Sequence, residues 1–138
     1  MIVANLQELK LFPVADRGVP NQERVPIQVL KATDMGQFGL LVGISSYHKL
    51  ATPVQDNLFW FGDGLVNAGD WILLYTGSGT PRADDWDTPP GSKVYSVHWG
   101  RPTTVFANSS VVPILFAVQG ADVGLSPSDL PQLGALGP

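Results

Sequence analysis

Three aspartates gather in one short segment of the sequence, Asp84, Asp85 and Asp87, around Trp86. Carboxylate oxygens are hard ligands of the kind that calcium takes in proteins, so this segment is a candidate calcium site. The spacing does not match an EF-hand loop, and no Glu stands at the far end to complete one. The alternative is a solvated acidic loop, and under that interpretation the protein has no cofactor.

Catalytic chemistry has few candidate residues. A hydrolytic triad would need His48 or His98 beside a Ser and a carboxylate. The segment Gly77-Ser78-Gly79 lacks the Gly-x-Ser-x-Gly pattern and the following helix of a nucleophile elbow. The chain has no Cys, which excludes thiol nucleophiles, disulfides and thiolate metal sites. We therefore assign no catalytic residue and predict that the protein is not an enzyme.

Aromatic side chains offer a different chemistry, because exposed Trp and Tyr rings on β-proteins can stack on sugars or other small ligands. The chain has four Trp and three Tyr residues. Trp86 lies in the acidic segment, where we expect it to be exposed, and with Tyr95 it forms the candidate ligand-binding pair. A carbohydrate or small-ligand binding module is accordingly one alternative function.

The composition narrows the class of protein. Charged residues make up 14% of the 138 positions, against about 25% in a typical soluble domain. Hydrophobic residues reach 44%, which excludes a disordered chain. The net charge of -4 argues against a nucleic-acid partner, since phosphate binding needs a basic surface. We find no apolar stretch long enough for a membrane span and no signal peptide, so synthesis in the cytoplasm is expected and the final location is left open.

The elements that must position these residues are short strands. With 15 Gly and 12 Pro, turn signals interrupt every long amphipathic pattern. Short apolar runs between turns predict an all-β fold, an antiparallel two-sheet β-sandwich of about eight strands with an extended C-terminal tail. The predicted strands are 6–14, 24–31, 38–44, 57–61, 71–76, 93–99, 103–106 and 111–118, and long loops are expected at 45–56 and 77–91.

Several of these runs are apolar on both faces. A strand with one solvated face should alternate between apolar and polar side chains. Continuous apolar runs instead occur at 38–44, 58–61, 71–75 and 111–116. Something must cover the second face of these strands: a loop, the C-terminal tail or another subunit.

The C-terminal tail differs from an ordinary solvated terminus. We divide the chain into a β-sandwich domain over 1–118 and a tail over 119–138 that is rich in Gly, Pro and Leu. Free tails are normally polar. This one is expected to dock on its own domain or on a neighbouring copy, through the candidate interface residues Leu125, Leu130, Leu133 and Leu136.

The order of segments resembles the lamin-tail domain, an immunoglobulin-like β-sandwich, over about residues 20–118. The matching segments are the early Glu-containing strand 21–27, the Gly-aromatic step and apolar strand 35–43, the hairpin and Thr-Gly strand end 59–77, and Trp99-Gly100 with 105–109. A second acidic residue in the early strand and an Asp-x-x-Gly close after the last strand are absent. The resemblance implies a binding or structural module and carries no catalytic residue.

Low charge, strands with two apolar faces and a Leu-bearing tail together predict a non-catalytic structural or interaction module. We expect its partner to be protein, with self-association into a homo-oligomer through the apolar sheet surface and the tail. A component of a virion or of another repeating assembly is a further alternative, since it would use the same surfaces.

Overall fold

The computed structural model describes residues 5–46 and 50–127, and the fold there is nearly all β. One 3-10 turn, η1 (Met35–Gln37), is the sole helical element of this part. None of its helical segments has the length and apolar character needed to cross a membrane. The strands are β1 (Leu9–Leu11), β2 (Arg24–Val29), β3 (Thr33–Asp34), β4 (Phe38–Ser45), β5 (Ala51–Trp60), β6 (Leu65–Val66), β7 (Trp71–Tyr75), β8 (Arg82–Asp85), β9 (Lys93–His98) and β10 (Val111–Ala117).

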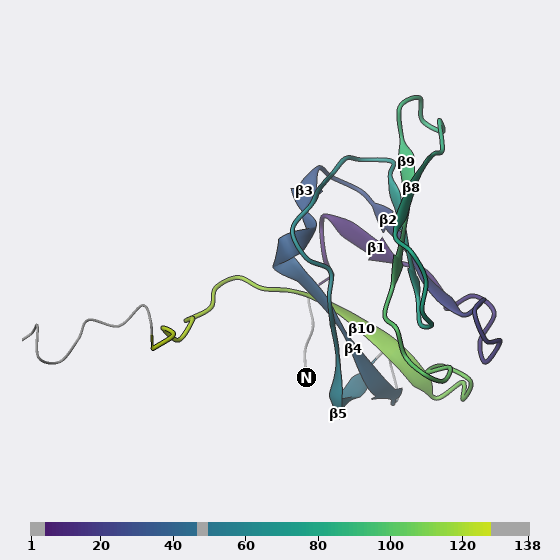
Figure 1. Ribbon diagram of the computed structural model, residues 1–138, viewed down its shortest axis with the longest axis vertical. Coiled ribbons are helices and arrows are strands. Elements are labelled where there is room, and N and C mark those ends of the chain that lie inside the picture. The colour runs from purple at the N-terminus through teal and green to yellow at the C-terminus, as the bar shows by residue number, and fades with distance from the viewer. Residues whose placement is uncertain (1–4, 47–49, 128–138) are drawn as a thin grey trace, which may run out of the picture.

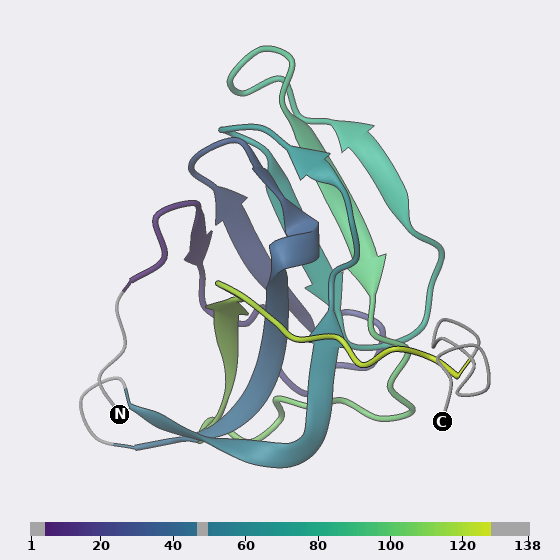
Figure 2. The same ribbon diagram turned by 90° about the vertical axis from the view of Figure 1, so that its left-hand side faces the viewer.

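Two larger sheets share one hydrophobic core (Figures 1 and 2). The five-stranded sheet has the order β1-β2-β7-β9-β8, and the three-stranded sheet has the order β10-β4-β5. Alternation along each strand sends every second side chain inward. Val25, Ile27 and Val29 of β2 therefore face Phe38 and Leu40 of β4 across a core in which all five are buried. The prediction of an all-β protein is confirmed.

The prediction of wholly antiparallel sheets is wrong at one position. Strand β7 pairs with β9 in parallel, with Trp71 opposite Val94 and Tyr75 opposite His98. The cause is β8, which pairs antiparallel with the edge of β9 that faces away from β7. This arrangement places β9 between β7 and β8. Because β8 runs back along the sheet before β9 begins, β9 must run in the direction of β7.

Three predicted segment boundaries also differ from the structure. The expected loop 77–91 contains β8, whose four residues are all exposed. The expected loop 45–56 contains the first part of β5, an edge strand. The expected strand 103–106 is an irregular segment, yet its Phe106 is completely buried. Strand formation here follows backbone pairing, which the side-chain pattern does not reveal.

A buried carboxylate fastens this irregular segment. Glu23 is 1% exposed and accepts hydrogen bonds from the amides of Gly18 (2.7 Å), Val105 (2.7 Å) and Phe106 (3.1 Å) and from the hydroxyl of Thr76 (2.9 Å). Burial raises the pKa of Glu23, but these hydrogen bonds outweigh it and hold the pKa below the ordinary 4.5. The carboxylate thus joins three segments that lie far apart in the sequence.

Acidification is expected to remove this contribution. A lowered folded-state pKa stabilises the protein fully above the unfolded-state value near 4.5 and loses its effect as the pH falls through the folded-state pKa. Urea unfolding of the wild type and of Glu23→Gln, followed from about pH 7 to about pH 3, should show a stability difference that narrows on acidification. A difference that stays constant over this range would contradict the role of the charged form.

Candidate functional site

The outer surface of the three-stranded sheet carries apolar side chains from all three strands, although the first part of β5 also holds exposed polar residues such as Asp56. Because opposite residues share a face, the register places one set of side chains outward, away from the buried Phe38, Leu40 and Val42. We call this set the apolar face: Gly39, Leu41 and Gly43 of β4, Leu58 and Trp60 of β5, and Val112, Ile114 and Phe116 of β10. None of these positions holds a charged or polar side chain.

Large side chains of this face remain accessible. Leu58 is 53% exposed and Trp60 is 45% exposed, although both belong to a regular strand. None of the residues of the apolar face belongs to the core cluster, since that cluster is built from the opposite side of the sheet. In the described part of the chain, the second apolar side of these strands is therefore not buried in the core.

Glycines shape the middle strand of the face. A Cβ on Gly39 would lie 2.6 Å from Cζ of Phe116 and 3.1 Å from Cε3 of Trp60, and a Cβ on Gly43 would lie 2.6 Å from Cδ1 of Ile114. Side chains of β5 and β10 thus lean over the two glycines, with the Trp60 and Phe116 rings 6.3 Å apart. The result is a low, continuous hydrocarbon surface in place of separate projecting side chains.

A groove of about 1070 Å³ follows β10 along the edge of this face. Leu41, Ile114 and Phe116 line it from the apolar face, and 5–8 and 117–120 line it from the chain segments on either side. Among the strands that the structure describes, β10 pairs with β4 alone, so its other edge is open. The face therefore combines a hollow with an open strand edge.

The described part of the tail leaves from this same edge. Residues 119–127 are exposed, and Val123 and Leu125 are among the most exposed apolar side chains of the described chain. Figure 1 shows this segment, in yellow, running away from the body of the domain. The tail residues 119–127 are all exposed, Leu125 among them, while Leu130, Leu133 and Leu136 lie outside the described residues, so docking of the tail stays a prediction.

No family model matches this chain, and neither does a curated protein or a solved structure. The resemblance to the lamin-tail domain accordingly stays a prediction. What the protein does must be argued from its own surfaces.

The predicted calcium ligands do not form a metal-binding cluster. Asp84 and Asp85 lie on β8, and Asp87 follows in the loop between β8 and β9. Asp85 instead accepts a 2.9 Å contact from Nζ of Lys93, its register partner, and this hydrogen bond lowers the pKa of the Asp85 carboxyl. No group of three or more His, Cys, Asp or Glu side chains suited to a metal occurs within 5–46 and 50–127.

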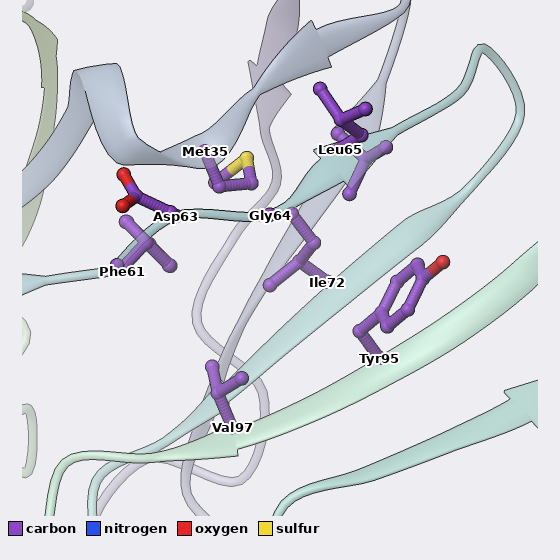
Figure 3. A pocket seen from close by; sticks show the side chains of 10 residues that line it. Met35, Phe61, Asp63, Gly64, Leu65, Ile72, Tyr95 and Val97 are labelled. Atoms are coloured by element: carbon purple, nitrogen blue, oxygen red, sulfur yellow. The ribbon is translucent and has the colours of Figure 1, made fainter.

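The two residues of the predicted ligand-binding pair, Trp86 and Tyr95, have different surroundings. Trp86 is 49% exposed, as expected, in the loop between β8 and β9. Tyr95 points inward from β9 and lines a cavity of about 170 Å³ with Met35, Ile72 and Val97 (Figure 3). Trp86 is not part of that cavity. The volume is below the 300–1,000 Å³ that ligand pockets usually have. Ligand binding by Trp86 and Tyr95 stays a prediction.

The two histidines that could act as general bases, His48 and His98, lie in different parts of the chain. His48 lies outside the described residues. His98 faces outward on β9, on the same side as Ser96, and both line a pocket with Tyr75, Thr80 and Arg82. Neither Ser96 nor Arg82 stands out in the sequence, because the register that brings them to His98 leaves no local pattern there.

Proposed function

We propose that this protein is a non-catalytic interaction module that associates with a second copy of itself through the apolar face. The observation that carries the proposal is the composition of the apolar face, which exposes Leu58 and Trp60 and whose eight positions hold no charged side chain. Soluble monomers rarely expose a large contiguous apolar surface, and such surfaces mark protein contacts. Because this face is uncharged, no electrostatic repulsion would oppose its contact with the same face of a second copy or with another apolar surface.

A second copy is the partner that best fits these features, because one chain carries two complementary apolar elements. The face has a hollow edge along β10, and the exposed apolar tail with Val123 and Leu125 leaves from that same edge. Two copies could therefore pair their faces while each tail lies against the neighbour. We also propose that the fold is an immunoglobulin-like sandwich of the lamin-tail type. Two facing sheets with a common core support this assignment.

Sedimentation velocity of the full chain over a range of concentrations tests the proposal. We expect a monomer that gives way to a dimer as concentration rises, whereas a series of larger species would indicate a repeating assembly. Leu58→Lys should weaken association about tenfold or more, because a buried interfacial anchor contributes about 2 kcal/mol. Leu125→Lys should weaken it as well if the tail takes part.

Leu65→Lys is the matched control, since Leu65 is 79% exposed on β6 and does not belong to the apolar face. It should associate like the wild type. A wild type that stays monomeric, or equal effects of Leu58→Lys and Leu65→Lys, would contradict self-association through this face. An unchanged Leu125→Lys variant would remove the tail from the proposal.

A further inference from the structure

A second site lies on the other sheet, on the outer surface of β7, β9 and β8. A pocket of about 300 Å³ opens there, lined by Tyr75, Thr80, Arg82, Ser96 and His98. The register explains why these side chains converge: Tyr75 lies opposite His98, and Ser96 lies opposite Arg82. Thr80 stands two residues before Arg82 and so returns to the same face.

The His98 ring is held in place on two sides. It stacks on Tyr75 with ring centroids 5.3 Å apart and an interplanar angle of 21°. Gly79 lies against its other side, where a Cβ would stand only 2.5 Å from Nδ1 and 2.7 Å from Nε2. The ring is thus positioned by a neighbouring aromatic side chain and by the absence of a side chain at 79.

Nδ1 of His98 is buried and has no hydrogen-bond partner among the described residues. Buried polar atoms in folded proteins are almost always paired with protein groups, water or a ligand. An unpaired imidazole nitrogen on a pocket-lining side chain therefore points to a polar group that enters the pocket.

The charge of the lining selects the kind of group. Arg82 brings a guanidinium, and no carboxylate belongs to the pocket lining. The nearest acidic partner is Asp84, whose Oδ2 lies 3.5 Å from Nη2 of Arg82 with both side chains well exposed, so this pair is weak. Hydroxyls of Tyr75, Thr80 and Ser96 add further hydrogen-bond donors.

We infer that this pocket binds a small oxyanion, a phosphate or carboxylate group held by Arg82 with His98 and the surrounding hydroxyls. A planar guanidinium matches both groups, because its N–H donors can pair with two oxygens at once. The site lies on the sheet opposite the apolar face and does not depend on self-association.

The test uses the 138-residue chain labelled with ¹⁵N, titrated at constant ionic strength with sodium phosphate or with sodium acetate, and with sodium chloride as the baseline. We expect saturable shifts of the amides of 80–82 and 96–98 and of the His98 ring nitrogens with at least one of the two oxyanions. Saturation by phosphate alone assigns a phosphate group, by acetate alone a carboxylate, and by both a general oxyanion site. Saturation by neither up to roughly 20 mM would overturn the proposal.

Two variants and a control separate a built site from general charge attraction. Arg82→Gln should weaken binding about tenfold or more, because charge-assisted hydrogen bonds contribute about 1.5–3 kcal/mol. Gly79→Ala should weaken it too, since the added Cβ displaces the His98 ring. Lys93→Gln removes the same charge from the other end of the β8–β9 ladder and should leave affinity within about twofold. Equal losses in Arg82→Gln and Lys93→Gln would overturn the site.

Discussion

Glu23→Gln is expected to lower the free energy of unfolding by about 3 kcal/mol at neutral pH. The amide keeps one acceptor oxygen and replaces the other by an NH₂ group. If the oxygen stays with Thr76 and Val105, the NH₂ faces the amide of Gly18. Two donors then meet in a site that is 1% exposed, and neither finds an acceptor. Leaving a buried donor unpaired costs about 1–3 kcal/mol for each group.

Urea denaturation followed by tryptophan fluorescence measures this loss, because two-state unfolding gives the free energy directly. Asp16→Asn is the matched control, as it makes the same chemical change on an exposed carboxylate. Asp16 pairs with Arg24 at 2.7 Å with its side chain 51% exposed, and surface pairs contribute about 0–1 kcal/mol. Similar losses of unfolding free energy in the two variants would show that the buried hydrogen bonds of Glu23 stabilise the protein no more than the exposed ion pair of Asp16.

The inner half of the fold follows from the sequence. Val25, Ile27 and Val29 alternate with less buried residues, and that pattern fixes both a strand and its buried face. The runs 38–44, 58–61 and 111–116 have no polar face, and the structure brings these three together in one sheet. The residues of each run indicate that the strand it forms has two apolar sides. It does not indicate that they are neighbours, which depends on pairing between distant segments.

The candidate sites were harder to predict, because strand register decides them. Along β9, Tyr95 and Val97 alternate with Ser96 and His98, and both sets contain groups that proteins bury. This alternation leaves open which set faces the core, and the structure places Tyr95 in the lining of a cavity with Met35, Ile72 and Val97. Strand β8 carries no apolar signal at all, since it forms through its backbone pairing with β9. Because the sequence does not indicate β8, it does not indicate that Arg82 lies near His98.

The two outer surfaces of the protein suit different partners. The face of β10-β4-β5 is hydrocarbon without charge and matches an apolar protein surface. The face of β7-β9-β8 carries Arg82, Ser96 and His98 around a pocket and matches a small polar group.

Phe106→Ala is expected to cost about 3–5 kcal/mol, the usual range for removing a buried aromatic ring. Phe106 is fully buried although it belongs to no strand, and its amide is fixed by Glu23 at 3.1 Å. Arg17 fastens the same segment, since its Nη1 donates to the carbonyls of Phe106 (3.0 Å) and Val111 (2.8 Å). The backbone is therefore held while the ring is removed, and the site cannot easily collapse to fill the cavity.

Phe12→Ala is the control for the same truncation on an outer surface. Phe12 is only partly buried, with its ring 4.9 Å from that of Trp71, and an aromatic pair of this kind contributes about 0.5–1.5 kcal/mol beyond its buried area. Thermal and urea unfolding of both variants should separate them by about 2 kcal/mol, with Phe106→Leu recovering part of the loss. An equal loss in Phe106→Ala and Phe12→Ala would contradict the expectation that burial of the Phe106 ring in the core sets the size of the effect.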